Sequence, residues 1–256
     1  MPECRQHLFI VPLKGINECF LNNIKELASF KSERFLFVLS IQEQDSYIRA
    51  QEVFRMEENV YVIHPESTFE RTEHWEFVVK FAVSYLEFDT FSYYFFGDDL
   101  DLSSFPDIKN QADILLNDYF IDDWAYIKEN VSVKALKKHS AKEVIRKKFM
   151  LGQPICAPLQ KIIFRRRIAA IMSFDCQHSY VSDQIMVHEL IEKSFTIGFI
   201  KEPFYKINKI NRNYTNSIKV SEIIKQQLYL YCRVKCLVGI PAILLRTIVK
   251  YLFKIK

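Results

Sequence analysis

Short apolar runs alternate with amphipathic segments through the first part of the chain, and this alternation restricts the possible folds more than any other sequence feature. The apolar runs are rich in β-branched and aromatic residues and cover residues 7–13, 34–41, 59–65 and 91–97. Between them, apolar side chains recur at helical spacing in residues 17–30, 46–56 and 73–88. Nearly continuous apolar strands are typical of a sheet that is buried on both faces. The order therefore predicts an open α/β sheet flanked by helices.

The second half of the chain is less regular. Residues 106–150 are more polar and end in a basic, helix-like stretch at 133–150. After it we expect a strand-like run that ends at residue 164, helices over 165–174 and 182–194, and a strand over 195–203. Ser182 stands at the N-cap position of the second of these helices.

The composition is that of a folded protein. Of the 256 residues, 49% are hydrophobic and 26% are charged, which excludes wholesale disorder. The length fits one large domain or two small ones. A formal charge of +4 is too small to indicate nucleic acid, and no compact basic groove is evident. The acids lie mostly before residue 130, whereas the last part of the chain is basic.

Cysteine usage and the N-terminal sequence favour the cytosol. The six cysteines lack the short paired spacings of a metal or disulfide framework, so free thiols are expected. The start, MPECRQHLFIVPLKG, has no basic segment followed by a long apolar run, as a secretory signal would. No segment reaches the ~20 apolar residues that span a bilayer.

The segment FSYYFFGDDLDLSSF, residues 91–105, places three carboxylates directly behind an apolar strand. Asp98, Asp99 and Asp101 repel one another and are unfavourable to desolvate, so a cation is expected to offset them. A site for Mn²⁺ or Mg²⁺ would do so, because these ions prefer carboxylate oxygens. A solvated turn whose acids cap a helix, and a proton-relay pair, remain as alternatives. Ligands of open α/β sheets bind at the carboxyl ends of strands, where Pro12 and Ser40 are also expected.

The ordered series of segments resembles a known family. Residues 10–27, IVPLKGINECFLNNIKEL, followed by a second strand and the acid cluster, are similar to the nucleotide-sugar half of GT-A glycosyltransferases of the family-2-like, bacterial surface polysaccharide type. In the second half, APLQKIIFRRRIAAIMSFD (157–175) and HSYVSDQIMVHELIEKSFTIGFIKEPFYKI (178–207) look like the later segments of these enzymes. The resemblance covers residues 7–207 and rests on the order of the motifs rather than on any single one.

The resemblance implies transfer of a sugar from a nucleotide-diphosphate donor to an acceptor hydroxyl, with inversion. It assigns Asp99 and Asp101 to Mn²⁺ or Mg²⁺, and Asp183 to the general base that deprotonates the acceptor. The residues that would bind the nucleotide sugar are Pro12, Leu13, Ser40, Gln42, Asp98 and Asp99. From the residues alone, Asp183 is equally an acid placed in the first turn of a helix by the helix dipole.

Three departures from the family pattern restrict these implications. Leu100 stands where many members carry a third consecutive acid, so the pair that ligates the metal is open. The second strand offers Ser40 and Gln42 where the family commonly has an aspartate that contacts the base. The QxxRW motif of processive synthases is absent, which favours addition of a single sugar.

We expect one GT-A domain over residues 1–220, with a nucleotide-sugar half (1–105) and an acceptor half (106–220). A basic amphipathic helical tail, residues 221–256, follows it. In the tail, Arg246, Lys250 and Lys254 recur at i,i+4 opposite an apolar face, which predicts contact with an anionic membrane surface. The alternative is a terminal helix packed on the protein's own core or on a second subunit.

The sequence therefore predicts a metal-dependent glycosyltransferase that works in cell-surface glycan synthesis. It would act on a glycan or a lipid-linked glycan at the inner face of the membrane. The alternative is a catalytically silent GT-A-like module that binds a membrane glycan-assembly complex. Phosphoryl transfer is a weaker hypothesis, because no glycine-rich phosphate loop is present. His64, His74 and His188 are expected to be structural.

Overall fold

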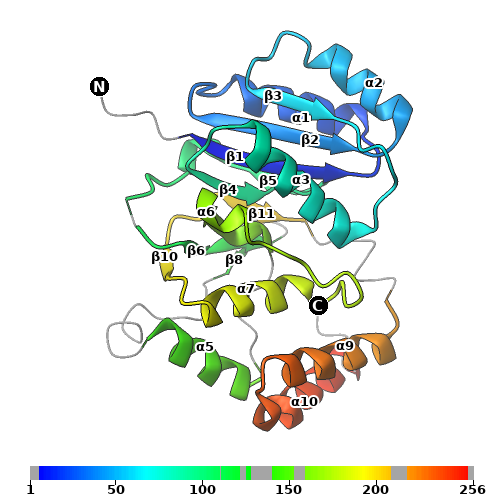
Figure 1. Ribbon diagram of the computed structural model, residues 1–256. Coiled ribbons are helices and arrows are strands. Elements are labelled where there is room, and N and C mark those ends of the chain that lie inside the picture. The colour runs from blue at the N-terminus through cyan, green and yellow to red at the C-terminus, as the bar shows by residue number, and fades with distance from the viewer. Residues whose placement is uncertain are drawn as a thin grey trace.

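A computed structural model describes most of the chain (Figure 1). The described residues are 6–109, 111–121, 125–127, 140–152, 159–208 and 218–252. Of the sequence predictions, the first part of the helix expected over 133–150 and Lys254 of the tail lie outside these ranges.

A seven-stranded mixed sheet forms the centre of the molecule, in the order β10-β6-β9-β4-β1-β2-β3. Its strands are β1 (His7–Leu13), β2 (Phe35–Ile41), β3 (Val60–Ile63), β4 (Thr90–Tyr93), β6 (Ile114–Asn117), β9 (Ile162–Arg165) and β10 (Ile197–Ile200). All neighbours pair in parallel except β9, which runs antiparallel to both β4 and β6. The predicted α/β sheet flanked by helices is confirmed.

Helices cover both faces of this sheet, and the strands alternate their side chains between them. The flanking helices are α1 (Glu18–Ser29), α2 (Gln44–Val53), α3 (Arg71–Tyr85), α6 (Arg166–Ala169) and α7 (Ser182–Glu192). In β1, Phe9 joins the apolar cluster that contains α1, whereas Leu8 joins the cluster that contains α3 and α7. Continuous apolar strands are needed because each face has its own core.

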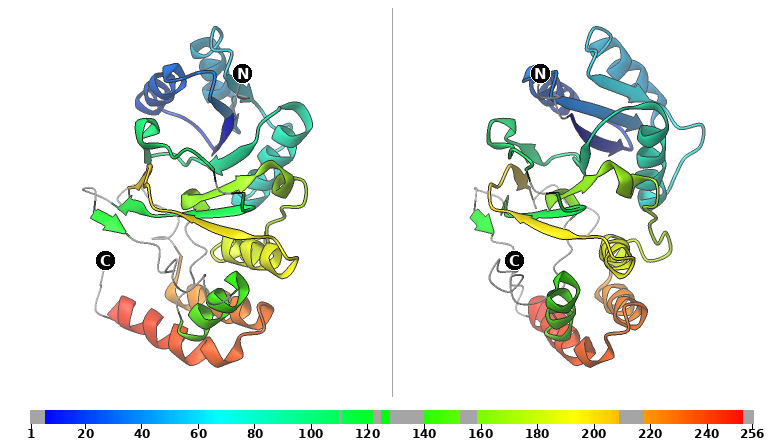
Figure 2. Two further views of the ribbon diagram at one scale, coloured as in Figure 1. Left: turned by 90° about the vertical axis from the view of Figure 1, so that its left-hand side faces the viewer. Right: turned by 60° about the vertical axis from the view of Figure 1, so that its left-hand side comes forward.

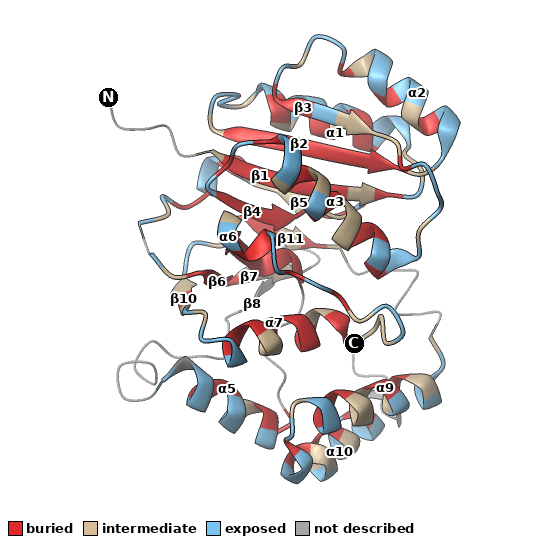
Figure 3. Ribbon diagram, viewed as in Figure 1, coloured by how far each residue is buried: buried red, intermediate tan, exposed pale blue. Residues whose placement is uncertain are grey.

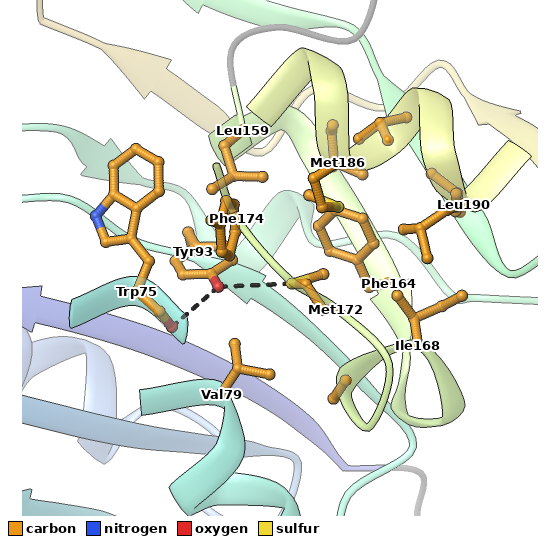
Figure 4. Packing of buried hydrophobic residues seen from close by; sticks show 14 of the residues in the cluster. Trp75, Val79, Tyr93, Leu159, Phe164, Ile168, Met172, Phe174, Met186 and Leu190 are labelled. Carbon is orange, nitrogen blue, oxygen red and sulfur yellow. Dashed lines mark hydrogen bonds between the residues drawn. The ribbon is translucent and has the colours of Figure 1, made fainter. Parts of the chain in front are cut away.

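Tyr93, at the end of β4, lies in the centre of the α3–α7 core (Figure 4). Its hydroxyl donates to the carbonyl of Trp75 at 3.3 Å and contacts the sulfur of Met172 at 3.7 Å. On the other side of this core, Met186 and Leu190 of α7 pack over Phe164 of β9. The packing fixes the end of β4, and with it the start of the acid cluster.

A second, smaller sheet pairs the acid cluster with strands from a later part of the chain. Its order is β5-β11-β7-β8, with β5 (Asp99–Leu100), β11 (Tyr205–Ile207), β7 (Tyr119–Ile121) and β8 (Ala125–Ile127). β5 and β11 pair antiparallel, and the register places Lys206 opposite Asp99.

Three helices form a separate layer at the end of the molecule opposite β3 and α2 (Figures 1 and 2). They are α5 (Ala141–Met150), α9 (Val220–Arg233) and α10 (Ile240–Leu252), with the 3₁₀ turn η4 (Leu237–Gly239) before α10. The Phe149 ring joins this layer to α7, since its centroid lies 5.6 Å from Tyr231 and 5.8 Å from His188. Within the described ranges, no helix is both long enough and apolar enough to cross a membrane.

Several predicted boundaries were wrong. The strand expected over 91–97 ends at Tyr93, and Gly97 follows with a φ of +84°, a backbone conformation that glycine adopts readily. The helix expected over 165–174 stops at Ala169. Val181, not Ser182, is the N-cap of α7, and it makes no side-chain capping bond. The helical tail consists of two helices, α9 and α10, and the segment 234–239 between them contains η4.

Candidate functional site

The carboxyl ends of the parallel strands bring the predicted binding residues to one edge of the sheet. β1 and β2 pair with Pro12 beside Ser40 and Leu13 beside Ile41. β4, the other neighbour of β1, leads directly into the acid cluster. Residues separated by more than eighty positions in the sequence therefore share one edge, as the fold predicts.

Ser40 and Gln42 both bind His74, a buried residue of α3. The side-chain oxygen of Gln42 accepts from the backbone N–H of Phe69 at 2.6 Å, so its amide nitrogen faces Nδ1 of His74 at 3.1 Å. Nδ1 must then be an acceptor, and Nε2–H donates to the Ser40 hydroxyl at 2.7 Å. Burial lowers the pKa of His74 to about 4, so the ring is neutral at neutral pH. Contact of Ser40 and Gln42 with a nucleotide base stays a prediction.

The loop between β1 and α1 packs closely against the start of α2, a contact that the sequence did not reveal. A Cβ on Gly15 would lie 2.3 Å from a carboxylate oxygen of Glu43, so a larger residue there would displace the Glu43 side chain. The Ser46 hydroxyl donates to the same carboxylate and accepts from the backbone N–H of Ile16 at 3.2 Å. These bonds shape the edge of the sheet beside Leu13 and Gln42.

Asp98 is buried, with an exposed fraction of 4%, and its carboxylate binds residues that are distant in the sequence. Its carboxylate accepts hydrogen bonds from the Tyr205 hydroxyl at 2.8 Å, the Asn208 backbone N–H at 3.0 Å and the Gln160 amide at 3.1 Å. Hydrogen bonds to a charged acceptor are strong, and these three compensate for the desolvation of the carboxylate.

Asp99 forms an ion pair with Lys206. The lysine Nζ lies 2.5 Å from Oδ2 of Asp99, and the side-chain amide of Asn208 donates to the same oxygen at 3.3 Å. The aspartate side chain is 42% exposed, whereas that of Lys206 is 14% exposed. Lys206 places a positive charge beside the acid cluster. This charge offsets the repulsion among the carboxylates.

Asp101 caps the 3₁₀ turn η1 (Leu102–Ser104). Oδ1 accepts from the backbone N–H groups of Ser103 and Ser104 at 3.0 and 3.3 Å, and both hydroxyls also donate to the carboxylate. Burial would raise the pKa of Asp101, but these hydrogen bonds outweigh it and hold the pKa below its ordinary value. This geometry matches the capping role that the sequence left open for one of the acids.

The acid cluster (Asp98, Asp99 and Asp101) can be compared with what a divalent metal ion needs from its ligands. Across the described ranges, no group of three or more His, Cys, Asp or Glu residues is placed to hold a metal ion. Mg²⁺ usually takes only one or two protein carboxylates and completes its shell with substrate phosphates and water. Asp99 fits that role, because the hydrogen-bonding contacts that it makes with described residues fall on Oδ2, so among these residues Oδ1 is open. Asp101 would have to share oxygens that already accept several hydrogen bonds.

Asp183 lies in the first turn of α7 and is partly buried. Its Oδ1 accepts from the backbone N–H of Gln184 at 2.8 Å. Burial raises its pKa to about 6, although the positive charges of Arg71 and Lys161 and the backbone hydrogen bonds oppose the rise. A carboxylate with this pKa is ionised at neutral pH and is a stronger base than an ordinary aspartate.

The 3₁₀ turn η2 (Leu159–Lys161) connects the two groups of acids. Gln160 holds Asp98, and the next residue, Lys161, acts on Asp183 through its charge. Lys161 is almost fully buried, an unusual place for an ammonium group. A lysine inside the apolar run LQKIIF was the only sequence signal for it.

Polar atoms beside Asp183 are buried without hydrogen-bond partners. In the part of the chain that the structure describes, these include the Ser182 hydroxyl oxygen and the side-chain oxygen of Gln184. Such atoms are rare in folded proteins and call for a partner such as a ligand or a water. They belong to the residues directly before and after the predicted base in the sequence.

The other two predicted structural histidines lie away from the acids. His64 bonds to the Ile41 carbonyl through Nδ1 at 2.8 Å and stacks on Tyr47. His188 packs edge-on against Phe149, and burial lowers its pKa. Within the described ranges, neither histidine contacts Asp98, Asp99 or Asp183.

No protein-family model and no curated protein matches the sequence. Solved structures do match the fold. Residues 1–349 of TarS from S. aureus, in complex with UDP-GlcNAc, superpose with a TM-score of 0.64 and 14% identity, covering 98% of this chain and 76% of that one. The chain has the GT-A fold.

Two further GT-A structures agree with it. The mannosyltransferase PcManGT from Pyrobaculum calidifontis, in complex with GDP-Man and Mn²⁺, has a TM-score of 0.56 and 9% identity, covering 97% of this chain and 71% of that one. Glucosyl-3-phosphoglycerate synthase from Mycobacterium tuberculosis, with Mg²⁺ and UDP, has a TM-score of 0.51 and 11% identity over 93% and 80% of the two chains. At these identities the likeness establishes the fold, and the activity has to be argued from the site.

Proposed function

We propose that the protein is an inverting glycosyltransferase that moves one sugar from a nucleotide-diphosphate sugar to an acceptor hydroxyl. One observation carries the proposal: Asp98, the neighbour of the half-exposed acid Asp99, binds Gln160, and the next residue, Lys161, places its charge near a base of raised pKa, Asp183. The similar structures bind UDP-GlcNAc, GDP-Man and UDP, which supports a nucleotide-sugar donor.

In this reaction Asp183 would take the proton of the acceptor hydroxyl as the oxygen attacks the sugar carbon. The nucleotide diphosphate would leave from the opposite side, which gives inversion. Because Arg71 and Lys161 place positive charge near Asp183, the carboxylate stays ionised at neutral pH despite its burial. Pro12, Leu13, Ser40 and Gln42 line the edge of the sheet where the nucleotide is proposed to lie.

We propose Mn²⁺ or Mg²⁺ as the cofactor, held by Asp99 with the donor phosphates. Asp101 remains a second candidate ligand, as the sequence predicts. The ion would act as a Lewis acid that eases departure of the nucleotide. Two of the structures with the same fold contain Mn²⁺ or Mg²⁺, which supports this assignment.

The acceptor proposed from the sequence is a glycan or lipid-linked glycan of the cell surface, reached at the inner face of the membrane. The protein would then work in the cytoplasm as a peripheral membrane enzyme. These assignments follow from the family resemblance and the basic tail, residues 221–256.

A thermal-shift screen with UDP-, GDP-, CMP- and dTDP-linked sugars, with and without Mn²⁺, tests the proposal. A donor at one hundred times its Kd should stabilise the fold by about 2.7 kcal/mol. We expect one nucleotide class to give a clear shift that depends on Mn²⁺, and release of the free nucleotide when acceptor is added.

Asp99→Asn and Asp107→Asn form a matched pair for this screen. Asp107 is an exposed aspartate in the same region and pairs with Lys109 at 3.3 Å. Loss of the shift in the first variant and its retention in the second would locate the donor at the acid cluster. Donor binding with no turnover on any acceptor would favour the catalytically silent module.

A further inference from the structure

The helical layer carries several exposed large apolar residues, and exposed positions are coloured pale blue along α5 and α10 in Figure 3. The members are Met150, Leu151, Leu237, Val238, Leu245, Ile248 and Val249, hereafter the apolar patch. Val238 is 74% exposed, Leu245 65% and Leu151 64%. A cluster of large apolar residues at such exposure is typical of an interaction surface.

Contacts between distant segments assemble the patch. At Gly152, which follows α5 with a φ of +63°, a Cβ would lie 2.8 Å from the backbone of Ala242 in α10. Arg246 donates to the Gly152 carbonyl at 3.1 Å. A Cβ at Gly239 of η4 would lie 2.4 Å from the Phe149 carbonyl. The end of α5 is therefore held between η4 and α10, and Met150 and Leu151 lie beside the other members.

α10 divides its apolar residues between two faces. Ile243 and Thr247, four positions apart, are buried against the rest of the helical layer. Leu245, Ile248 and Val249 lie on the remaining surface at the spacing of one helical face. The helix thus has an anchored side and an apolar side that is exposed among the described residues.

Basic residues border the patch. Lys147 lies in the last turn of α5, Lys235 lies two residues beyond the end of α9 and Arg246 belongs to α10; all three are exposed. Residues 221–256 contain seven basic residues and one acidic residue, Glu222. In the part of the chain that the structure describes, Lys147, Lys235 and Arg246 therefore make the border of the patch complementary to negative charge.

We propose that the apolar patch and its basic border dock the protein on an anionic lipid surface. The apolar side chains would enter the boundary between headgroups and acyl chains while the ammonium and guanidinium groups lie near lipid phosphates. This surface differs from the tail that the sequence predicted, because α5 supplies part of it and α10 is packed on the protein. It deepens the proposed function by naming the surface that faces a lipid-linked acceptor. Lipid binding is measured without donor or acceptor, so its failure and that of glycosyl transfer are distinguishable.

Co-sedimentation of the full-length protein with phosphatidylcholine vesicles, with and without phosphatidylglycerol, tests the docking. We expect binding to the anionic vesicles that weakens as salt is added. Val238→Asp and Leu245→Asp should each lower the partition coefficient about tenfold or more, since each replaces an inserted apolar side chain by a charge. Both side chains are exposed, so the melting temperatures should stay at the wild-type value.

Two controls match these variants. Met56→Asp changes an apolar side chain that is 86% exposed but lies beyond α2, at the opposite end of the molecule. Lys147→Glu, at the border of the patch, is matched by Lys25→Glu, an exposed lysine of α1. We expect wild-type vesicle binding in Met56→Asp and Lys25→Glu, and weakened binding in Lys147→Glu.

Equal binding of Val238→Asp, Leu245→Asp and the wild type would overturn the proposal, and so would a wild-type protein that ignores anionic vesicles. Light scattering tests the other possible occupant of the apolar patch, a second copy of the chain. A wild-type dimer that Val238→Asp converts to a monomer, without vesicle binding by either, would assign the patch to a second copy of the chain instead.

Discussion

At the residue scale, Asp183 combines a chemical advantage with a cost in stability. Its pKa rises from 3.8 to about 6 because the carboxylate is buried. At about 1.36 kcal/mol per pKa unit, the ionised form is unfavourable in the folded state by on the order of 3 kcal/mol. The cost is complete above the folded pKa and disappears below the unfolded one, where both states are protonated.

Asp183→Asn should therefore lose activity and gain stability together. We expect kcat to fall by ~10²–10⁴, the usual contribution of a positioned base, with donor affinity unchanged. The melting temperature should exceed that of the wild type at pH 8, and the difference should shrink as the pH falls from 6 towards 4. In the wild type, kcat should rise through pH 6 as Asp183 ionises. Collapse of donor affinity with turnover intact would make Asp183 a binding residue.

Asp99 and Asp101 should respond differently to removal, although the sequence places them as equivalents. Asp99→Ala removes the carboxylate from an ion pair in which Asp99 is 42% and Lys206 14% exposed, so it should cost about 1–3 kcal/mol while the Mn²⁺-dependent donor shift is lost. Asp101→Ala removes the cap of η1 and should cost about 0.5–2 kcal/mol. Melting curves and transfer assays on both variants check this, and full activity in both would remove the metal assignment from the cluster.

His74 should make the protein sensitive to acid. Its pKa is lowered to about 4 in the folded state, so between pH 6.5 and 4 the unfolded chain binds more protons and stability falls as the pH falls. His74→Gln has no titrating ring and should show a flatter loss of stability over this window. Chemical unfolding at pH 7.5 and 4.5 measures the difference. The same slope in both proteins would mean that other groups dominate.

At the element scale, strands that form apolar runs were predictable, and strands inside polar segments were not. The run at 7–13 matches β1, because its apolar residues, Leu8, Phe9, Ile10, Val11 and Leu13, need burial on both faces. β6 was missed, since its four residues lie in a polar segment and owe their burial to β9 and β10. The acids of the site could be read from the sequence, but their partners could not. Lys206, Gln160 and Asn208 reach them only through the pairing of β5 with β11 and the position of η2.

α10 should be part of the fold and not a removable tail. Ile243 is 3% exposed, whereas Ile248, on the other side of the helix, is 44% exposed. Ile243→Ala should cost about 2–5 kcal/mol of unfolding free energy, and Ile248→Ala should stay within about 0.5 kcal/mol. Truncation after Val234 should lower the melting temperature as well, because Phe149 and Tyr231 lose their cover. Equal effects of the two alanine variants would contradict this packing.

At the scale of the whole molecule, the two halves expected from the sequence, 1–105 and 106–220, are interlocked. β9 lies between β4 and β6 in the sheet, and Asp98 binds residues from η2, β11 and the segment after β11. Asp98→Ala would leave the Tyr205 hydroxyl and the Gln160 amide without their acceptor.

That variant should be among the more destabilised single substitutions, at about 3 kcal/mol or more, since each orphaned buried donor costs about 1–3 kcal/mol. Asp107→Ala, an exposed aspartate, should leave the melting temperature unchanged. A stable Asp98→Ala protein that still binds donor would show that the hydrogen bonds of Asp98 are not needed to shape the site.

The hydrogen bonds of Asp98 also determine when the candidate site can form during synthesis of the chain. The carboxylate leaves the ribosome 110 residues before Asn208, the last of its partners. At about 5–20 residues per second, roughly 6–22 s pass in which β1 to β4 have been synthesised while the acidic loop lacks the groups that hold it. A nascent chain would therefore have the strands of a nucleotide-binding edge well before it could close that edge, and competence for a donor would be among the last properties to appear during synthesis.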